Sequence, residues 1–498
     1  MQKRIIALLS AAVLIVTAFT GCVSNNNDGE STTVLTSAKK TDDSNFKLSY
    51  TQADSLDPFE AETQNNQVLA TLVFESLFDL DESYEISPNI AAGYEFSDTK
   101  TLKVELNEGL VFSNGNAVSA EDVLYSTRAA LKSPAYGSSL GCISSVEGSG
   151  NTVTFHLKYA NPYAANLLTY PIASQKDDKN GYPVGSGRYK YENKNDKTVL
   201  TAVKDSSFDP YITTVNLVNI AAEDSIDNAV NIGNISYAFR DMSADTSKRL
   251  SCAKKAVTMN NLVYIGVNSS RGITSNADIR RAISLAADRK TLAQSAYSGY
   301  AQAAQSTFNP AFKSIENVRL FADAADTDAA KQAVNQSGYK ESLLTLTILV
   351  NNNENRIAAA NLIKTQLELV GFKVKIDRQN NGSYVKRIQS GNFDIYIGEV
   401  KLSDDMCLYP FFDSKNGGAR YGIDSKKLES GTLYTQYLEG KAELGKFVLA
   451  FNEEMPFIPL LYKKGMICYS KALQGDMQGY YGNFFSNIES WSFMSEND

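Results

Sequence analysis

The chain has 498 residues, a length at which one hydrophobic core no longer grows, so two or three domains are expected. Its hydrophobic content of 43% and charged content of 21% are those of an ordinary globular protein. The formal net charge of −8 argues against nucleic-acid binding, because the phosphate backbone selects a basic surface.

The N-terminus predicts an export signal over residues 1–21. The basic start MQKR precedes the apolar run IIALLSAAVLIVTAF, which is shorter than the ~18 residues of a membrane-spanning helix. Gly21 and Cys22 then resemble the bacterial lipobox, although Phe19 stands where an aliphatic residue is usual. This resemblance implies that Cys22 carries a diacylglycerol thioether. Residues 22–44 are polar and predict a flexible tether, which places the folded part at the outer face of the bacterial cytoplasmic membrane.

A mixture of strands and helices follows the tether, which predicts an α/β or α+β protein. Phe46–Tyr50 is expected to be a strand, and a helical stretch is expected over residues 65–81. Residues 101–106 alternate as a strand, and Ser119 is expected to cap a helix over residues 120–131.

Residues 279–290, IRRAISLAADRK, predict one amphipathic helix, because their apolar side chains recur at i, i+4, i+7 and i+8. Its charged residues include Arg281 and Asp288, seven positions apart. We expect these two residues to form structural ion pairs and caps rather than to bind a ligand.

The chemistry that an enzyme needs is scarce, so no catalytic residue, cofactor or metal is predicted. His156 is the single histidine and lies on the polar face of an expected strand. No P-loop, nucleophile elbow or dinucleotide turn is present. The cysteines after the signal form no C-x-x-C pair and are expected to be free buried thiols, with disulfides left open; they are Cys142, Cys252, Cys407 and Cys468. A hydrolase built on two carboxylates stays an alternative.

A series of motifs then identifies a family. The chain has LDP at residues 56–58, FESLF at 74–78, PNIAAGY at 88–94, a run from Leu106 through Gly109, Phe112, Asn114, Gly115, Val118, Ala120 and Asp122 to Val123, PVGSGRYKYE at 183–192, and the segment from Asp278 to Arg289 followed by GYA at 299–301. In this order the motifs resemble the extracellular solute-binding proteins of the peptide/nickel class, the ligand-capturing lipoproteins of ABC importers. The resemblance covers nearly all of residues 45–495.

The resemblance implies a two-lobed periplasmic-binding-protein-like fold of type II, with an extra subdomain in the first lobe. The boundaries that it implies are 45–265 and 460–498 for the first lobe, about 58–165 for its extra subdomain, and 266–459 for the second lobe. The apolar segments NNLVYIGVN at 260–268 and PFIPLLYKK at 456–464 are the hinge candidates. The implied partners are a peptide or other small solute and the importer's permease and ATPase subunits, and we expect a monomer.

Ligand specificity is expected in the segment that follows the strand FDIYIG, which is predicted to end at Gly398. Open α/β sheets place ligands beyond such strand ends. The candidate binding residues are Glu399, Lys401, Asp404, Asp405, Arg420 and Tyr421. In peptide binders of the family a Trp and then an Asp that holds the peptide's amino group occur here. This chain has Glu399 in place of the Trp and no clear counterpart of the Asp, so a peptide-signal receptor without transport and a binder of a nickel chelate remain alternatives.

Overall fold

The computed structural model describes residues 45–203, 208–242, 250–315, 317–413, 421–423, 428–477 and 479–493. The predicted signal, Cys22 and the tether at residues 1–44 lie outside these ranges, as does Arg420. Within the described ranges no helix is both long enough and apolar enough to span a bilayer.

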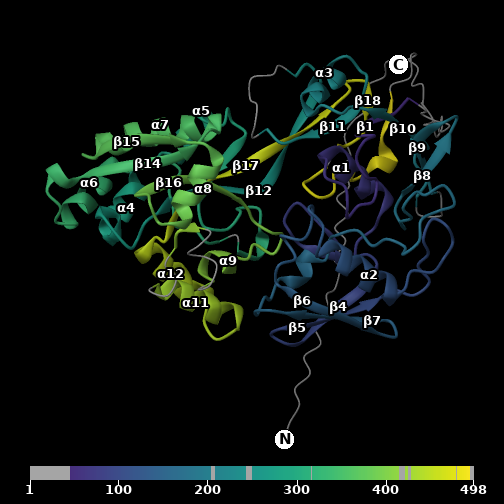
Figure 1. Ribbon diagram of the computed structural model, residues 1–498, viewed down its shortest axis with the longest axis horizontal. Helices are drawn as coiled ribbons and strands as arrows, with labels where there is room; N and C mark the ends of the chain where they lie inside the picture. Colours follow the sequence, from purple (N-terminus) through teal and green to yellow (C-terminus); the bar gives the residue numbers. More distant parts are fainter. Residues whose placement is uncertain are drawn as a thin grey trace, which may run out of the picture. The chain divides into compact units, whose positions relative to one another are not determined.

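Eleven strands of the described chain form one mixed sheet, in the order β15-β14-β16-β12-β17-β11-β1-β10-β9-β8, with β13 paired to β17 (Figure 1). Their bounds are β1 (Lys47–Tyr50), β8 (Tyr189–Lys194), β9 (Lys197–Ala202), β10 (Thr214–Asn219), β11 (Tyr237–Arg240), β12 (Ala253–Val267), β13 (Ala301–Ala303), β14 (Thr345–Asn351), β15 (Lys373–Gln379), β16 (Ile395–Lys401) and β17 (Phe457–Tyr469). The predicted first strand is confirmed, one residue shorter than expected.

The two long strands β12 and β17 pair antiparallel and connect the two halves of this sheet (Figure 1). Except for Asn268 and Pro456, both hinge candidates lie within these strands, and their apolar residues there are buried. The pairing register shifts between Thr258 and Leu262. Met259 packs into one hydrophobic core and Leu262 into another, so the cores separate at this irregularity. The hinge role and the lobe boundaries stay predictions.

The first lobe carries a second sheet and three helices. This sheet has the order β4-β5-β7-β6, and a hairpin of β2 and β3 lies beside it in sequence. The bounds are β2 (Phe78–Leu80), β3 (Ile86–Pro88), β4 (Ala91–Asp98), β5 (Thr101–Leu106), β6 (Ile143–Ser149), β7 (Thr152–Leu157), α1 (Gln64–Val73), α2 (Ala120–Ala130) and α3 (Ile226–Asn231), with the short strands β18 (Leu473–Gln474) and β19 (Ser492–Phe493) near the chain end. The strand over 101–106 is confirmed, as is the cap: Ser119 and Asp122 form a capping box at the start of α2.

The helix predicted over residues 65–81 is too long. Helix α1 ends at Val73, Phe74 has extended backbone angles, and Phe78–Leu80 is a strand. Phe74, Leu77 and Phe78 are buried in the first-lobe core. A short apolar run of this kind suits a buried strand as well as a helix, so periodicity alone could not place the boundary.

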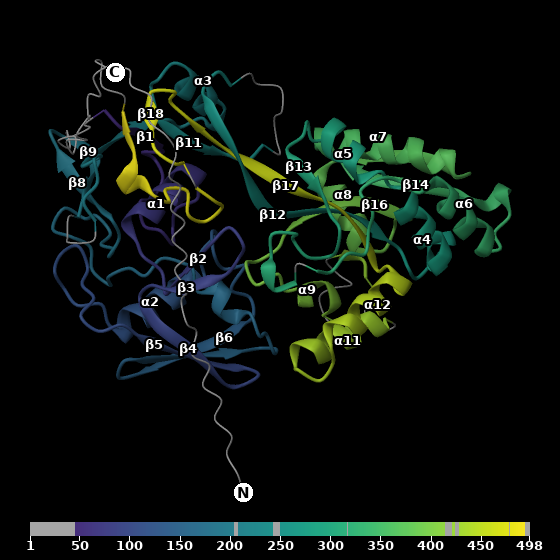
Figure 2. The same ribbon diagram turned by 180° about the vertical axis from the view of Figure 1, so that it is seen from behind.

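Helices cover the strands of the second lobe, as Figure 2 shows from behind. Their bounds are α4 (Ala277–Ala286), α5 (Arg289–Ser295), α6 (Thr327–Gln336), α7 (Glu354–Leu369), α8 (Asn381–Gln389), α9 (Tyr409–Phe412), α11 (Glu429–Leu438) and α12 (Leu444–Glu454). The core between helices and sheet contains many aromatic rings, including Phe411, which stacks on Phe457 with centroids 4.5 Å apart.

The single helix predicted over 279–290 is in fact two helices. Helix α4 ends at Ala286, and the side chain of Asp288 accepts a hydrogen bond of 2.8 Å from the amide of Thr291 at the start of α5. Arg281 pairs with Asp278 at 3.2 Å. The expected structural roles of Arg281 and Asp288 are therefore confirmed, and the capping carboxylate explains the break.

Candidate ligand-binding cleft

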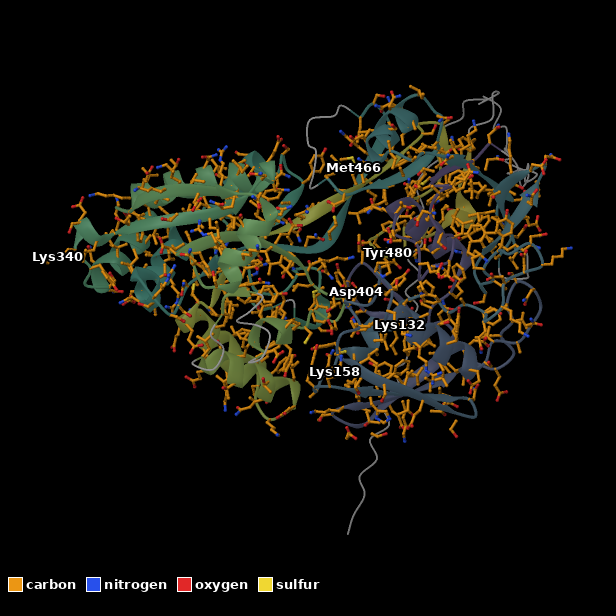
Figure 3. All side chains as sticks on the ribbon, viewed as in Figure 1. Lys132, Lys158, Lys340, Asp404, Met466 and Tyr480 are labelled. Carbon is orange, nitrogen blue, oxygen red and sulfur yellow. The ribbon has the colours of Figure 1, made fainter. Side chains whose placement is uncertain are left out.

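A cavity of about 380 Å³ lies between the two lobes. First-lobe residues that follow α1, together with the segments around Tyr136 and Tyr170, form most of its wall. Residues 401–404 close it from the second lobe, and residues 481–484 close it from the return segment. In Figure 3, Asp404 is labelled at the boundary between the lobes. This volume is within the range that small-molecule sites usually have.

The second-lobe wall begins where β16 ends, and that end differs from the prediction. The strand continues past Gly398 to Lys401, because Glu399 and Lys401 still pair with β12. The amide of Leu402 then bonds to the carbonyl of Asn260 at 2.9 Å, and the chain turns at Ser403. Lys401 and Asp404 therefore line the cavity from the end of the strand, as open α/β sheets usually place ligand-contacting residues.

Lys401 and Asp404 have opposite charges and influence each other. The Lys401 ammonium donates a hydrogen bond of 2.6 Å to the hydroxyl of Tyr481 and lies 4.4 Å from the centroid of its ring. Enclosure by the cavity wall opposes the charge on Lys401, but Tyr481, Asp404 and Asp241 outweigh it and raise the pKa of the ammonium. Burial raises the pKa of the Asp404 carboxyl to about 6, with Asp405 adding to the shift and Lys401 opposing it.

Three further charged residues of the cavity wall come from the first lobe, and they are not among the binding residues predicted from the sequence. They are Glu75, Asp79 and Arg188. Burial raises the pKa of Glu75, although the amide of Asn89 donates to its carboxylate at 2.6 Å. Arg188 donates to the carbonyl of Phe485 at 3.0 Å. Glu75 lies inside the quoted motif FESLF, and Arg188 lies inside PVGSGRYKYE, where a proline is usual in the family. These motif positions were the signal in the sequence that could have identified both residues.

The glycines of the motif PVGSGRY explain how this wall is built. A Cβ atom on Gly185 would lie 2.0 Å from the carbonyl oxygen of Val73, and one on Gly187 would lie 2.5 Å from the carbonyl carbon of Val73. The amide of Gly187 donates to the Val73 carbonyl at 2.9 Å. Only glycine allows the backbone to approach the end of α1 so closely, and this contact sets Arg188 beside Glu75 in the wall.

Glu399 lies within β16 and outside the cavity wall, in a buried ion cluster. Its carboxylate oxygens contact Arg356 at 3.0 Å and Lys463 at 2.6 Å, and Asn261 donates to it at 2.9 Å. Burial opposes its charge, but Lys463 and Arg356 outweigh burial and hold the pKa of Glu399 at about 2. The Lys463 side chain is only 2% exposed, so Glu399 compensates a buried cation at the crossing strand β17.

Asp405 and Tyr421 do not line the cavity. Asp405 is buried beside it and bonds to the first lobe. Tyr421 is buried, with its ring stacked on Phe411 at 4.2 Å between centroids. Arg420 lies outside the described residues. The structure thus brings Lys401 and Asp404 together at the cavity and holds Glu399, Asp405 and Tyr421 in other contacts.

The two lobes touch along one side of the cavity. Asn161 donates to Asp405 at 2.7 Å, and the rings of Tyr159 and Tyr409 stack with centroids 3.9 Å apart. The hydroxyl of Tyr163 lies 3.2 Å from that of Tyr437. Each pair joins a first-lobe residue to a second-lobe residue, so these contacts exist only while the lobes are together.

The single histidine does not take part in this site. His156 lies on the half-exposed face of β7, as predicted, and its Nε2 atom is 3.2 Å from Glu147. Among the described residues, no group of three or more His, Cys, Asp and Glu is placed to hold a metal ion. The described cysteines are free thiols, and Cys142, Cys407 and Cys468 are buried, in agreement with the prediction.

Known proteins with similar sequences and structures bind solutes. Residues 85–419 match the model of the bacterial extracellular solute-binding proteins, family 5 Middle. The chain is 23% identical over 460 residues to the glutathione-binding protein GsiB of Salmonella typhi, covering 84% of this chain and 89% of that protein.

Solved structures show the same fold. The unliganded open form of MppA, a periplasmic murein tripeptide binding protein, has a TM-score of 0.71 and 18% identity over 91% of this chain and 98% of MppA. NikZ from Campylobacter jejuni, in complex with Ni(L-His), has a TM-score of 0.60 and 18% identity over 90% of this chain and 99% of NikZ. The predicted fold class, two-lobed α/β of the type II periplasmic-binding-protein kind, is confirmed by these likenesses.

Proposed function

The chain belongs to the bacterial extracellular solute-binding proteins of family 5, and we propose that it is the lipid-anchored binding component of an ABC importer, holding a peptide or peptide-like solute between its lobes. Members of this family bind solutes for transport and are not enzymes, which agrees with the expected lack of catalytic residues. The proposal includes a monomeric binding protein that docks on a permease with its ATPase.

The observation that carries the proposal is the mixed charge of the cavity wall. Lys401 and Arg188 supply cations, while Glu75, Asp79 and Asp404 supply carboxylates. A short peptide carries an ammonium at one end and a carboxylate at the other, so this wall is suited to a zwitterion. Aromatic and aliphatic residues of the same wall, such as Tyr136 and Phe74, can contact its side chains.

Capture by hinge closure is the second part of the proposal. The lobes are joined by β12 and β17, and the pairs Asn161–Asp405 and Tyr159–Tyr409 join their facing surfaces. A ligand that touches both lobes stabilises only the closed state, and closure removes water from its polar contacts. The contacts between the lobes support this interpretation because opening has to break them.

The relatives suggest the first ligands to test. GsiB is named for glutathione, MppA for a murein tripeptide, and NikZ was solved with Ni(L-His). A nickel chelate would meet the same charged groups through its organic ligand. We therefore expect a tripeptide with free termini to bind, and blocking either terminus to weaken the binding.

Titration calorimetry on the mature protein tests the proposal. The panel consists of glutathione, tripeptides with free, N-acetylated or C-amidated ends, and Ni(L-His). Lys401→Gln should lower the affinity for peptides with a free carboxylate by about tenfold and leave the affinity for C-amidated peptides unchanged. Lys132→Gln is the matched control, because Lys132 is exposed and lies outside the cavity wall. Equal affinity of the wild type and Lys401→Gln for a peptide with a free carboxylate would show that Lys401 in this cavity does not bind the carboxylate.

A further inference from the structure

Two of the described cysteines lie together in the first lobe, away from the ligand cavity. Cys468 is fully buried near the end of β17, and Cys252 is half-buried immediately before β12. Both pack in one small hydrophobic cluster with neighbours such as Ala238 and Met466. Neither side chain lines the cavity, so the proposed binding function does not use them.

The strand register explains why they meet. Ala253 pairs with Tyr469 and Lys254 pairs with Cys468. Continued by one residue, this register makes Cys252 and Cys468 diagonal neighbours on the same face of the ladder. Diagonal neighbours have Cα atoms ~7–8 Å apart, which is beyond the distance that a disulfide spans without backbone movement. Cys252 lies just outside the strand, where a small backbone shift brings it closer.

The surroundings of the two thiols are suited to exchange. The neighbouring Cys468 side chain, and after it the Cys252 backbone amide and the Lys254 ammonium, lower the pKa of the Cys252 thiol against the opposing effect of burial. The preceding residue, Ser251, donates to the Asn231 side chain through its amide at 2.8 Å and its hydroxyl at 3.0 Å, so the shift that brings the thiols together has to occur at Cys252 itself. A half-exposed thiol with a lowered pKa reacts with disulfides, and a buried thiol beside it can resolve the product.

We propose that Cys252 and Cys468 form a reversible disulfide by exchange with a small-molecule disulfide. The Cys252 thiolate attacks one sulfur of the external disulfide, forms a mixed disulfide and releases one thiolate, which takes up a proton. Cys468 then loses its proton and attacks the sulfur of Cys252, which expels the second external thiolate. The two protein thiols are oxidised to one disulfide, and the external disulfide is reduced to two thiols.

This disulfide would join the start of β12 to the end of β17 within the first lobe. It would not cross between the lobes, so closure around a ligand stays possible. A covalent link between residues so far apart in sequence restricts the unfolded chain, and the oxidised protein should melt at a higher temperature than the reduced one.

Peptide-level mass spectrometry of the intact mature protein tests the proposal. The protein is incubated with excess oxidised glutathione, free thiols are alkylated under denaturing conditions, and the chain is digested without reduction. We expect a cross-linked peptide pair containing Cys252 and Cys468, which reduction removes. Cys142 and Cys407 are built-in controls, because both are buried and neither packs in the cluster that contains the half-exposed Cys252, and they should be recovered alkylated.

Two variants separate the steps. Cys468→Ser should accumulate glutathione on Cys252, and Cys252→Ser should leave Cys468 reduced and alkylated. A stable glutathione adduct on Cys252 of the wild type would overturn the proposal, because it would show that Cys468 cannot reach the mixed disulfide. Full alkylation of both wild-type thiols after oxidation would overturn it as well.

Discussion

The side-chain amide of Asn161 in the first lobe donates a hydrogen bond of 2.7 Å to the carboxylate of Asp405 in the second lobe. Both residues are buried, and the Asp405 carboxylate also accepts from the amide of Cys407 at 3.1 Å. The bond therefore links the lobes in a place that water does not reach. Separation of the lobes has to break it and to hydrate both groups.

Asn161→Ala should shift the protein toward an open form. One net hydrogen bond is worth about 0.5–1.5 kcal/mol, so affinity for a ligand held by both lobes should fall about 2- to 10-fold. Calorimetry and small-angle X-ray scattering of the ligand-free protein measure the two effects. Asn107→Ala is the control, because Asn107 donates to the Asn89 carbonyl at 2.7 Å within the first lobe. Equal loss of affinity in both variants would argue against a role in closure.

Ligand binding should depend on pH through Asp404. Burial raises the pKa of this carboxyl to about 6 from its ordinary value of 3.8. Between these two values the folded state binds more protons than the unfolded state, so this group makes folding more favourable as pH falls through about 6 toward 3.8. A ligand ammonium binds the ionised carboxylate better than the protonated one, so the affinity for such a ligand should fall as pH falls.

We expect affinity for a peptide with a free amino group to weaken by up to about tenfold for each pH unit below 6. Calorimetry at several pH values, in buffers with different ionisation enthalpies, measures both the affinity and the proton released on binding. Asp404→Asn should remove the pH dependence and the proton release. Retention of the same dependence in that variant would assign it to another group.

The ion cluster around Glu399 should be needed for stability. Glu399→Gln leaves Lys463 and Arg356 buried with less compensation, which typically costs about 3–5 kcal/mol of unfolding free energy. The pKa of Glu399 is lowered from 4.5 to about 2, so its contribution is complete above pH 4.5 and is lost as pH falls through 2. Urea unfolding at neutral pH measures the difference. The control is Glu147→Gln, an exposed carboxylate that pairs with His156, which should change stability by less than about 1 kcal/mol.

Arg281 within α4 and Arg289 at the start of α5 should differ sharply in their effect on stability. Arg289 is 2% exposed and donates to the carbonyls of Pro459 at 2.9 Å and Ser284 at 3.2 Å. Arg289→Met leaves these buried carbonyls without donors, which should cost about 3 kcal/mol. Arg281→Met removes only a partly exposed pair with Asp278 and should cost less than about 1 kcal/mol. Equal unfolding free energies for the two variants would refute this assignment.

The local features of this fold could be predicted because they depend on neighbours in sequence. Ser119 caps α2 through Asp122, three residues away in the first turn of the same helix. The break at Asp288 was missed, although Asp is a preferred residue at the position just before a helix. The apolar spacing, which continues through Ala287, concealed the break between the two helices.

The candidate site was predicted only in part, because its charges come from segments far apart in the chain. Lys401 and Asp404 could be found from the end of a strand, but Tyr481, which accepts from Lys401, lies in the return segment. Glu399 looked like a ligand-contacting residue because the strand was predicted to end before it. Its neutralisation by Lys463, on a different strand, depends on sheet pairing that the sequence pattern does not contain.

The last prediction concerns anchoring by Cys22, which the signal and the polar segment after it suggest. A diacylglycerol thioether brings two acyl chains, and each buried CH₂ adds ~0.8 kcal/mol, so the lipidated chain should stay with the membrane when cells are fractionated. Cys22→Ala removes the sulfur that forms the thioether and should release the protein into the soluble extracytoplasmic fraction. Cys252→Ala keeps the lipid and should stay with the membrane, which controls for loss of a cysteine elsewhere. Membrane retention of Cys22→Ala after a high-salt wash would mean that another segment anchors the chain.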